Sequence, residues 1–227
     1  MKKYLIISMA VLALVGCGGS ANTTKNSTSA EISSSIQETG TVQQSDASED
    51  NHNVLIAYFS WASNVENNDV DSISSASIVD GNYHIAADYV KNATGGDLFE
   101  IKTETTYPVD YDSTTHQASE EKADNFRPVL TSHIDNISDY DTVVLVYPNW
   151  WGTYPMAIAS FTEEYDLSGK TVMPICTNEG SGMGTSESDL AQLLPDSDVR
   201  EGLAIRGGDV ENSENDINKW LTDNGVI

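Results

Sequence analysis

The chain has 227 residues and a formal net charge of −24 at pH 7, with 35 acidic side chains against 11 lysines and arginines. This charge argues against nucleic acid as a partner and against direct adsorption to an anionic membrane, because both surfaces are negative. The chain holds two cysteines, Cys17 and Cys176. Cys176 ends an apolar run, which is typical of a small buried hydrophobic residue.

The first residues have the pattern of a targeting segment. Lys2 and Lys3 precede a short apolar run from Tyr4 to Val15, which is too short to span a bilayer as a helix. Leu14-Val15-Gly16-Cys17 resembles the lipobox of bacterial lipoproteins. The resemblance implies that residues 1–16 are a lipoprotein signal peptide and that Cys17 is lipidated. A plain secretory signal with an incidental cysteine is the alternative.

The segment 17–53 follows the predicted cleavage site. It is rich in serine and threonine, has no aromatic residue and shows no apolar period. Such a composition is typical of a disordered linker. We therefore expect a protein tethered to the extracytoplasmic face of a membrane, at the cell surface or in a periplasm, that meets the membrane through its lipid anchor only. Residues 54–227 are enough for one domain with a sizeable core.

Apolar runs and helical periods alternate along this domain. We predict strands over 54–59, 98–101, 143–147, 172–176 and 202–205, and helices over 83–93, 118–134, 155–163, 186–194 and 216–224. The second of these helices is expected to bend or restart at Arg127-Pro128. Alternating strands and helices predict an α/β fold, a three-layer sandwich around a five-stranded parallel sheet.

Two strand orders are common in such sheets, and the order 2-1-3-4-5 is favoured here. The chain has five strand units, and no Gly-x-Gly-x-x-Gly pattern follows the first strand. Ligands of open α/β sheets bind at the carboxyl ends of the strands where the strand order reverses. The turns after the first and third strands are therefore the first candidates for a binding site.

The turn after the third strand carries a tryptophan pair. Its sequence is Pro148-Asn149-Trp150-Trp151-Gly152, directly after a continuous apolar run. Two indoles at a ligand-binding edge suit a flat aromatic ligand. The alternative is that both indoles cap the hydrophobic core, since tryptophan is usually mostly buried.

The turn after the first strand begins with Ser60-Trp61, and Gly81-Asn82-Tyr83 stands immediately before the first helix. Together they resemble, in two halves, the Ser/Thr-x-Thr-Gly-Asn-Thr loop with which flavodoxin-like flavoproteins bind the FMN phosphate. In such a loop, backbone N–H groups and hydroxyls hold the phosphate at a helix N-terminus. Residues 62–80 would be a surface insertion. A plain helix entry capped by Asp80 or Asn82 is the alternative.

The resemblance to the flavodoxin-like family extends over essentially all of 54–227, including Gly96-Asp97-Leu98-Phe99-Glu100-Ile101 and Tyr107-Pro108. This part of the sequence is similar to a flavodoxin-fold domain found in bacterial lipoproteins. The resemblance implies noncovalently bound FMN, with one indole of the pair on the isoalloxazine ring and the other against protein. The implied cofactor contacts are Ser60, Trp61, Gly81, Asn82, Tyr83, Pro148, Asn149, Trp150, Trp151, Gly152, Thr177, Glu179, Gly180, Ser181 and Gly182.

The expected function is electron transfer or an oxidoreductase reaction through FMN, with a redox partner protein or a quinone as the partner. No catalytic side chain is required, because the chemistry belongs to the flavin. The four histidines lack metal-site spacing, so we expect no protein-held metal. A flavodoxin-fold binding module that has lost FMN is the alternative. A serine hydrolase is excluded, because no Gly-x-Ser-x-Gly is centred on Ser181.

Overall fold

The computed structural model describes residues 53–65 and 82–227. These residues belong to one compact unit, Ser48–Ile227. The predicted signal peptide, the lipidation site Cys17, the linker up to residue 52, the insertion from residue 66 onward and Gly81 lie outside the described residues.

A parallel sheet forms the centre of the domain, with the order β2-β1-β3-β4-β5 and with β6 also paired to β4. This confirms the predicted order 2-1-3-4-5 and the α/β fold. The strands are β1 Val54–Phe59, β2 Asp97–Ile101, β3 Thr142–Pro148, β4 Thr171–Asn178, β5 Asp198–Val199 and β6 Leu203–Arg206. β3 thus includes Pro148, one residue beyond its expected end, paired with Thr177.

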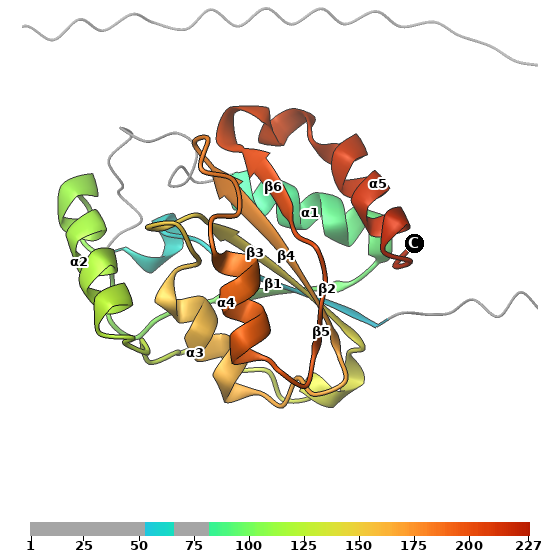
Figure 1. Cartoon of the computed structure of the whole chain (residues 1–227), viewed down its shortest axis with the longest axis horizontal. Coiled ribbons are helices and arrows are strands. Elements are labelled where there is room, and N and C mark those ends of the chain that lie inside the picture. Colours follow the sequence, from blue (N-terminus) through green and yellow to red (C-terminus); the bar gives the residue numbers. More distant parts are fainter. Residues whose placement is uncertain (1–52, 66–81) are drawn as a thin grey trace, which may run out of the picture. The chain divides into compact units, whose positions relative to one another are not determined.

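Helices cover both faces of the sheet. They are α1 Asn82–Thr94, α2 Tyr111–Ala123, α3 Met156–Glu164, α4 Ser186–Leu193 and α5 Glu214–Asp223, with short 3-10 helices η1 Ala62–Asn64, η3 Ile137–Asp139 and η4 Gly207–Asn212. In Figure 1, α1 and α5 lie on one face, α3 and α4 lie on the other, and α2 stands at the end of the sheet toward which β1 runs.

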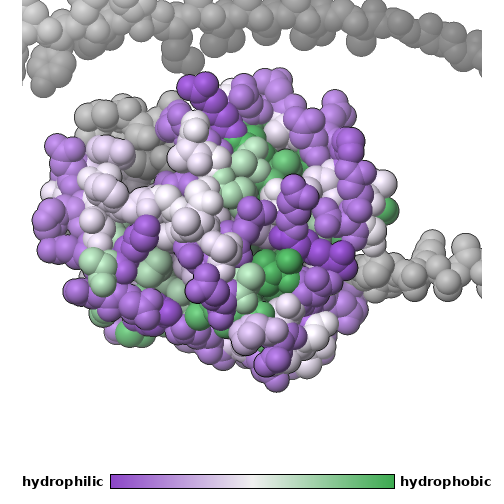
Figure 2. Space-filling view, viewed as in Figure 1, coloured by the Kyte–Doolittle hydropathy of each residue, from purple (hydrophilic) through white to green (hydrophobic). Residues whose placement is uncertain are grey.

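The core consists of two layers, one on each face of the sheet. Leu55, Ala57 and Phe59 of β1 belong to the layer under α3 and α4, whereas Val54 and Ile56 belong to the layer under α1 and α5. Successive side chains of a strand point to opposite faces, so a strand buried on both faces needs a continuous apolar run. Figure 2 shows mostly hydrophilic side chains on the outside of the domain, with small hydrophobic groups between them.

The helix expected over 118–134 is wrong at both ends. α2 begins after Asp110, whose side chain accepts a hydrogen bond of 2.8 Å from the Ser113 N–H and so caps the helix. α2 ends at Ala123, just before Asn125, which has a positive φ of 50°. Beyond it, Leu130 forms a bridge with Thr103 instead of continuing a helix. The Arg127-Pro128 pair therefore marks an extended segment, because proline disfavours a helical residue before it.

The single last strand expected over 202–205 is two short strands, β5 and β6. The Val172 carbonyl accepts a hydrogen bond of 2.9 Å from the Arg200 N–H, so the backbone groups of Val172 point toward β5 and β6. Because a strand repeats every two residues, the backbone of Pro174 points the same way. Pro174 has no N–H to donate. The register shifts between Val172↔Val199 and Ile175↔Leu203, which makes a bulge opposite the proline.

Candidate functional site

The turns after β3 and β4 meet at the carboxyl end of the sheet. The Gly152 carbonyl accepts a hydrogen bond of 2.7 Å from the Thr185 N–H. A Cβ atom on Gly184 would lie 2.0 Å from the Gly152 oxygen, so only glycine permits this approach. The two turns therefore form one continuous platform.

Asn149 fixes the shape of this platform. Its backbone N–H donates to the Thr177 carbonyl over 2.8 Å, and its Nδ2 donates to the Gly182 carbonyl over 2.9 Å. Its Oδ1 accepts a hydrogen bond of 2.9 Å from the Gly152 N–H. Asn149 was predicted as a cofactor contact, and the structure shows it linking the two turns to each other.

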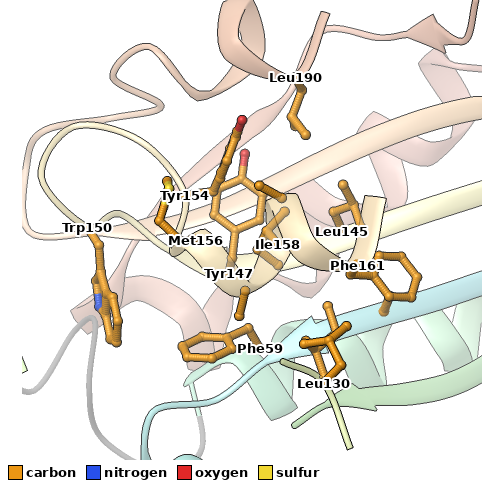
Figure 3. Close-up of a cluster of buried hydrophobic side chains, with 14 of the residues drawn as sticks. Phe59, Leu130, Leu145, Tyr147, Trp150, Tyr154, Met156, Ile158, Phe161 and Leu190 are labelled. Carbon is orange, nitrogen blue, oxygen red and sulfur yellow. The ribbon is translucent and has the colours of Figure 1, made fainter. Parts of the chain in front are cut away.

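The tryptophan pair is divided between the protein interior and the surface. Trp150 is 8% exposed and packs edge-on against Phe59 at 5.4 Å and Tyr107 at 5.2 Å between ring centroids. Figure 3 shows Trp150 at the end of the buried cluster, beside Phe59. Trp151 is 56% exposed. Trp150 thus caps the core, and Trp151 is the indole open to a ligand.

Trp151 is held in place by α2. Its indole N–H donates to the Thr115 carbonyl over 2.8 Å, and its own carbonyl accepts a hydrogen bond of 2.6 Å from the Lys122 ammonium. Its φ is +54°, which is costly for a side chain of this size. Strained backbone that is fixed by its surroundings is concentrated at functional sites.

A cavity of about 220 Å³ lies between α2 and this turn. Its walls carry no charged side chain; they are Tyr111, Thr114, Thr115, Ala118, Asn149, Trp150 and Trp151. The four residues from α2 share one face of the helix by their spacing. The sequence prediction missed this wall because α2 has no apolar stripe and was placed several residues too late.

The turn after β1 is buried and pinned by Asn64. Its Nδ2 donates to the carbonyls of Ser60 (2.7 Å) and Ile101 (3.1 Å), and its Oδ1 accepts from the Thr103 N–H over 2.8 Å. Ser60 and Trp61, both predicted cofactor contacts, are fully buried. Asn64 was not predicted, because no sequence pattern separates a buried asparagine from a loop asparagine.

Two polar atoms of predicted contacts are buried and unpaired. Neither the Trp61 Nε1 nor the Thr177 Oγ1 has a hydrogen-bond partner in the part of the chain that the structure describes. An unpaired buried polar group costs about 1–3 kcal/mol, so these two atoms lower the stability of the turns that carry them.

The turn after β4 is closed around Asn178. Its Oδ1 accepts hydrogen bonds from the Gly180 N–H (2.8 Å) and the Gly182 N–H (3.1 Å). These two amides were expected to face the flavin, and here they face the protein. Glu179 and Ser181 are exposed.

The remaining predicted contacts lie around the first helix. Asn82 and Tyr83 begin α1, as expected for residues at a helix N-terminus, and Gly81 lies outside the described residues. Across 53–65 and 82–227, no three His, Cys, Asp or Glu side chains are grouped closely enough to hold a metal ion. No helix of those two ranges is long and apolar enough to cross a membrane.

A doubly wound parallel sheet with this strand order, and with shaped turns at the carboxyl ends of β1, β3 and β4, defines a flavodoxin-like α/β protein. Residues 70–224 match the family model described as flavodoxin. The chain belongs to this FMN-binding family, as the resemblance implied.

Solved structures agree with this assignment. A proposed flavoprotein from Bacteroides eggerthii DSM 20697 is 31% identical over 75% of this chain and 96% of its own, with a TM-score of 0.60. Another from Bacteroides uniformis ATCC 8492 is 27% identical over 75% and 98%, also with a TM-score of 0.60. A flavoprotein from Lactobacillus acidophilus NCFM, solved in complex with FMN, shares the fold at 20% identity over 71% and 97%, with a TM-score of 0.53. No curated protein is significantly similar to the chain.

Proposed function

We propose that this protein binds FMN noncovalently and acts as an electron carrier or an oxidoreductase. The observation that carries the proposal is the exposed Trp151, fixed by α2 in a strained conformation at the ligand-binding edge of a flavodoxin-family sheet. The FMN complex of the Lactobacillus acidophilus flavoprotein, which has the same fold, supports the choice of cofactor.

The residues at this edge fit the groups of FMN. The phosphate needs neutral donors at a helix N-terminus, and the start of α1 at Asn82 is where this fold offers them. The exposed face of Trp151 suits the isoalloxazine ring.

When bound, FMN supplies the redox chemistry by taking up or giving electrons at its ring system. The side chains of this protein bind and orient it. Asn149 holds the β3 and β4 turns together, and the Thr115 carbonyl fixes the angle of the Trp151 indole. Glu179, exposed in the β4 turn, would give a flavin bound beside this turn a negatively charged neighbour.

We also propose that the protein works outside the cytoplasm, tethered by lipid on Cys17 and a linker up to residue 53. The Leu14-Val15-Gly16-Cys17 motif after a short apolar run supports this location. The electron partner is then a redox protein or a quinone. Mass spectrometry of the protein from its native membrane tests the anchor, and a peptide beginning with unmodified Cys17 would refute it.

Retention of FMN tests the cofactor assignment. The chain 18–227, mixed with excess FMN and passed through a desalting column, should retain one FMN per molecule and show a flavin absorption spectrum. Riboflavin, which lacks the phosphate, should be retained far less. No retained flavin would refute the proposal.

The second candidate is a flavodoxin-fold binding module without FMN. It is favoured by one observation, since the Gly180 and Gly182 amides are already satisfied by Asn178. Failure of the retention experiment, with the fold intact by circular dichroism, would leave this candidate standing.

A further inference from the structure

The face of α2 that points away from the Trp151 cavity borders a second hollow of about 350 Å³, which we call the α2 groove. Its lining combines carboxylates with apolar side chains: Thr105, Tyr107, Gln117, Glu120, Glu121, Asp124, Phe126, Pro128 and Val129. Phe126 is 52% exposed and Val129 is 62% exposed. Large apolar side chains left this open to water are a sign of an interaction surface when they are grouped.

The exposed apolar side chains of the described residues are concentrated around α2. The described residues include five large hydrophobic side chains that are exposed. Four of them flank α2 or lie in the turn that α2 holds: Val109, Phe126, Val129 and Trp151. The fifth, Ile227, is the last residue of the chain. Of the other four, Phe126 and Val129 line the α2 groove, so the groove offers an apolar contact to a partner.

The charge of the α2 groove is one-sided. Glu120, Glu121 and Asp124 line it, and no lysine, arginine or histidine does. The nearest cations along the chain are engaged elsewhere: Lys122 donates to the Trp151 carbonyl, and Arg127 makes two hydrogen bonds of 2.7 Å to Glu163. Glu120 has a partner in His116, whose Nδ1 lies 3.4 Å from its Oε2, whereas Glu121 and Asp124 form no ion pair with the residues that the structure describes.

Glu121 is the inner carboxylate of the α2 groove. It is 8% exposed, and it accepts hydrogen bonds from the Tyr107 hydroxyl (3.0 Å) and the Gln117 Nε2 (2.9 Å). A carboxylate has about four acceptor sites, so Glu121 keeps capacity for another donor. Apolar walls with carboxylates at one side match a lysine or arginine, whose aliphatic stem packs while its charged head makes hydrogen bonds.

We propose that the α2 groove docks a basic redox protein, with a lysine or arginine lying between Phe126, Val129 and the carboxylates. A second copy of this chain is a poor occupant, because two acidic grooves repel each other. The linker of this chain is equally unsuitable, because Lys25 is the single cation in 17–53. The identity of the partner as a redox protein rests on the proposed function. The match in charge and shape between the α2 groove and a basic side chain is independent of that function.

The position of the α2 groove suits electron exchange. Tyr107 lines it, and the Tyr107 ring lies 5.2 Å from Trp150, the neighbour of Trp151. A partner in the groove would thus be separated from the proposed flavin platform by one layer of aromatic side chains.

The test is a titration of flavin-free 18–227 with a small basic cytochrome c at low salt, followed by calorimetry. The double variant Glu120→Gln/Asp124→Asn should weaken binding by about 5-fold or more. The matched control Glu201→Gln/Glu211→Gln removes the same charge from exposed positions near α5 and should weaken it by less than about 2-fold. The uncharged change Val129→Thr should also weaken binding, because it removes the apolar wall.

Equal weakening by the two double variants, with no effect of Val129→Thr, would overturn the proposal and leave only nonspecific attraction. Absence of binding by the wild type would overturn it as well. Because the titration uses flavin-free protein, its outcome is independent of FMN. Groove-dependent binding by a chain that retains no flavin would keep the docking site and refute the proposed function.

Discussion

The Tyr107 hydroxyl donates a hydrogen bond of 3.0 Å to the Oε2 of Glu121, which joins the segment after β2 to the last turn of α2. Burial raises the pKa of Tyr107 well above its ordinary value, and the Glu121 carboxylate raises it further, so the phenol stays protonated and stays a donor. The Tyr107 ring also packs against Trp150. This pair therefore positions α2, which in turn fixes Trp151.

Removing this hydrogen bond should loosen α2. Tyr107→Phe keeps the ring but leaves the buried Glu121 with one donor fewer, which should lower the free energy of unfolding by about 2 kcal/mol. Urea unfolding measures it. Tyr111→Phe is the control and should change stability little, because the Tyr111 hydroxyl bonds to none of the described residues. Equal losses in the two variants would contradict this role of Tyr107.

Glu121 should give the domain a characteristic pH dependence. Burial raises its pKa above the ordinary 4.5, despite hydrogen bonds from Gln117 and Tyr107 that lower it. The fold then disfavours the ionised form, so the contribution of Glu121 to stability falls as the pH rises through 4.5 and the folded-state pKa. The unfolding free energy of Glu121→Gln relative to wild type should therefore increase between acidic and neutral pH. A difference that decreases over this range would contradict the assignment.

Two glycines of the β4 turn allow a matched comparison. Gly182 and Gly184 have φ values of +62° and +59°, but only a Cβ atom on Gly184 would clash, at 2.0 Å from the Gly152 oxygen. Gly182→Ala should cost about 1 kcal/mol of backbone strain. Gly184→Ala should cost about 3 kcal/mol or more, because the β3 and β4 turns must separate. Similar losses in thermal or urea unfolding would show that the two turns are not in contact.

The buried thiol should resist modification. Burial raises the pKa of Cys176 to about 12, so at pH 8 only about one molecule in ten thousand carries the reactive thiolate. In 18–227, where Cys176 is the one cysteine, iodoacetamide at pH 8 should react far more slowly with the folded than with the urea-unfolded protein. Equal rates would contradict the buried position.

The strands and their order could be predicted from the sequence because a buried parallel strand needs an uninterrupted apolar run, as Val143 to Tyr147 provides. α2 could not be placed, because neither face of Tyr111–Ala123 forms an apolar stripe. The break between β5 and β6 could not be predicted either, because it depends on Pro174 of the neighbouring strand β4, and Pro174 lies far from the break in sequence.

The candidate site shows the same division. Sequence position predicted that the turns with Trp151 and Gly182 would share one edge of the sheet, and the hydrogen bond from Asn149 to Gly182 bears this out. It did not predict which indole is exposed, because that depends on Phe59 and Tyr107 packing around Trp150. Asn64 and Glu121 were missed, since their roles arise from tertiary contacts alone.

The most direct test of the central claim is a fluorescence titration of FMN with 18–227 and with its Trp151→Leu variant. The wild type should quench the flavin emission at about 1 µM protein or below, and Trp151→Leu should bind about fivefold more weakly, since stacking on the exposed indole is worth on the order of 1 kcal/mol. Unquenched flavin at about 100 µM folded wild-type protein would contradict the account.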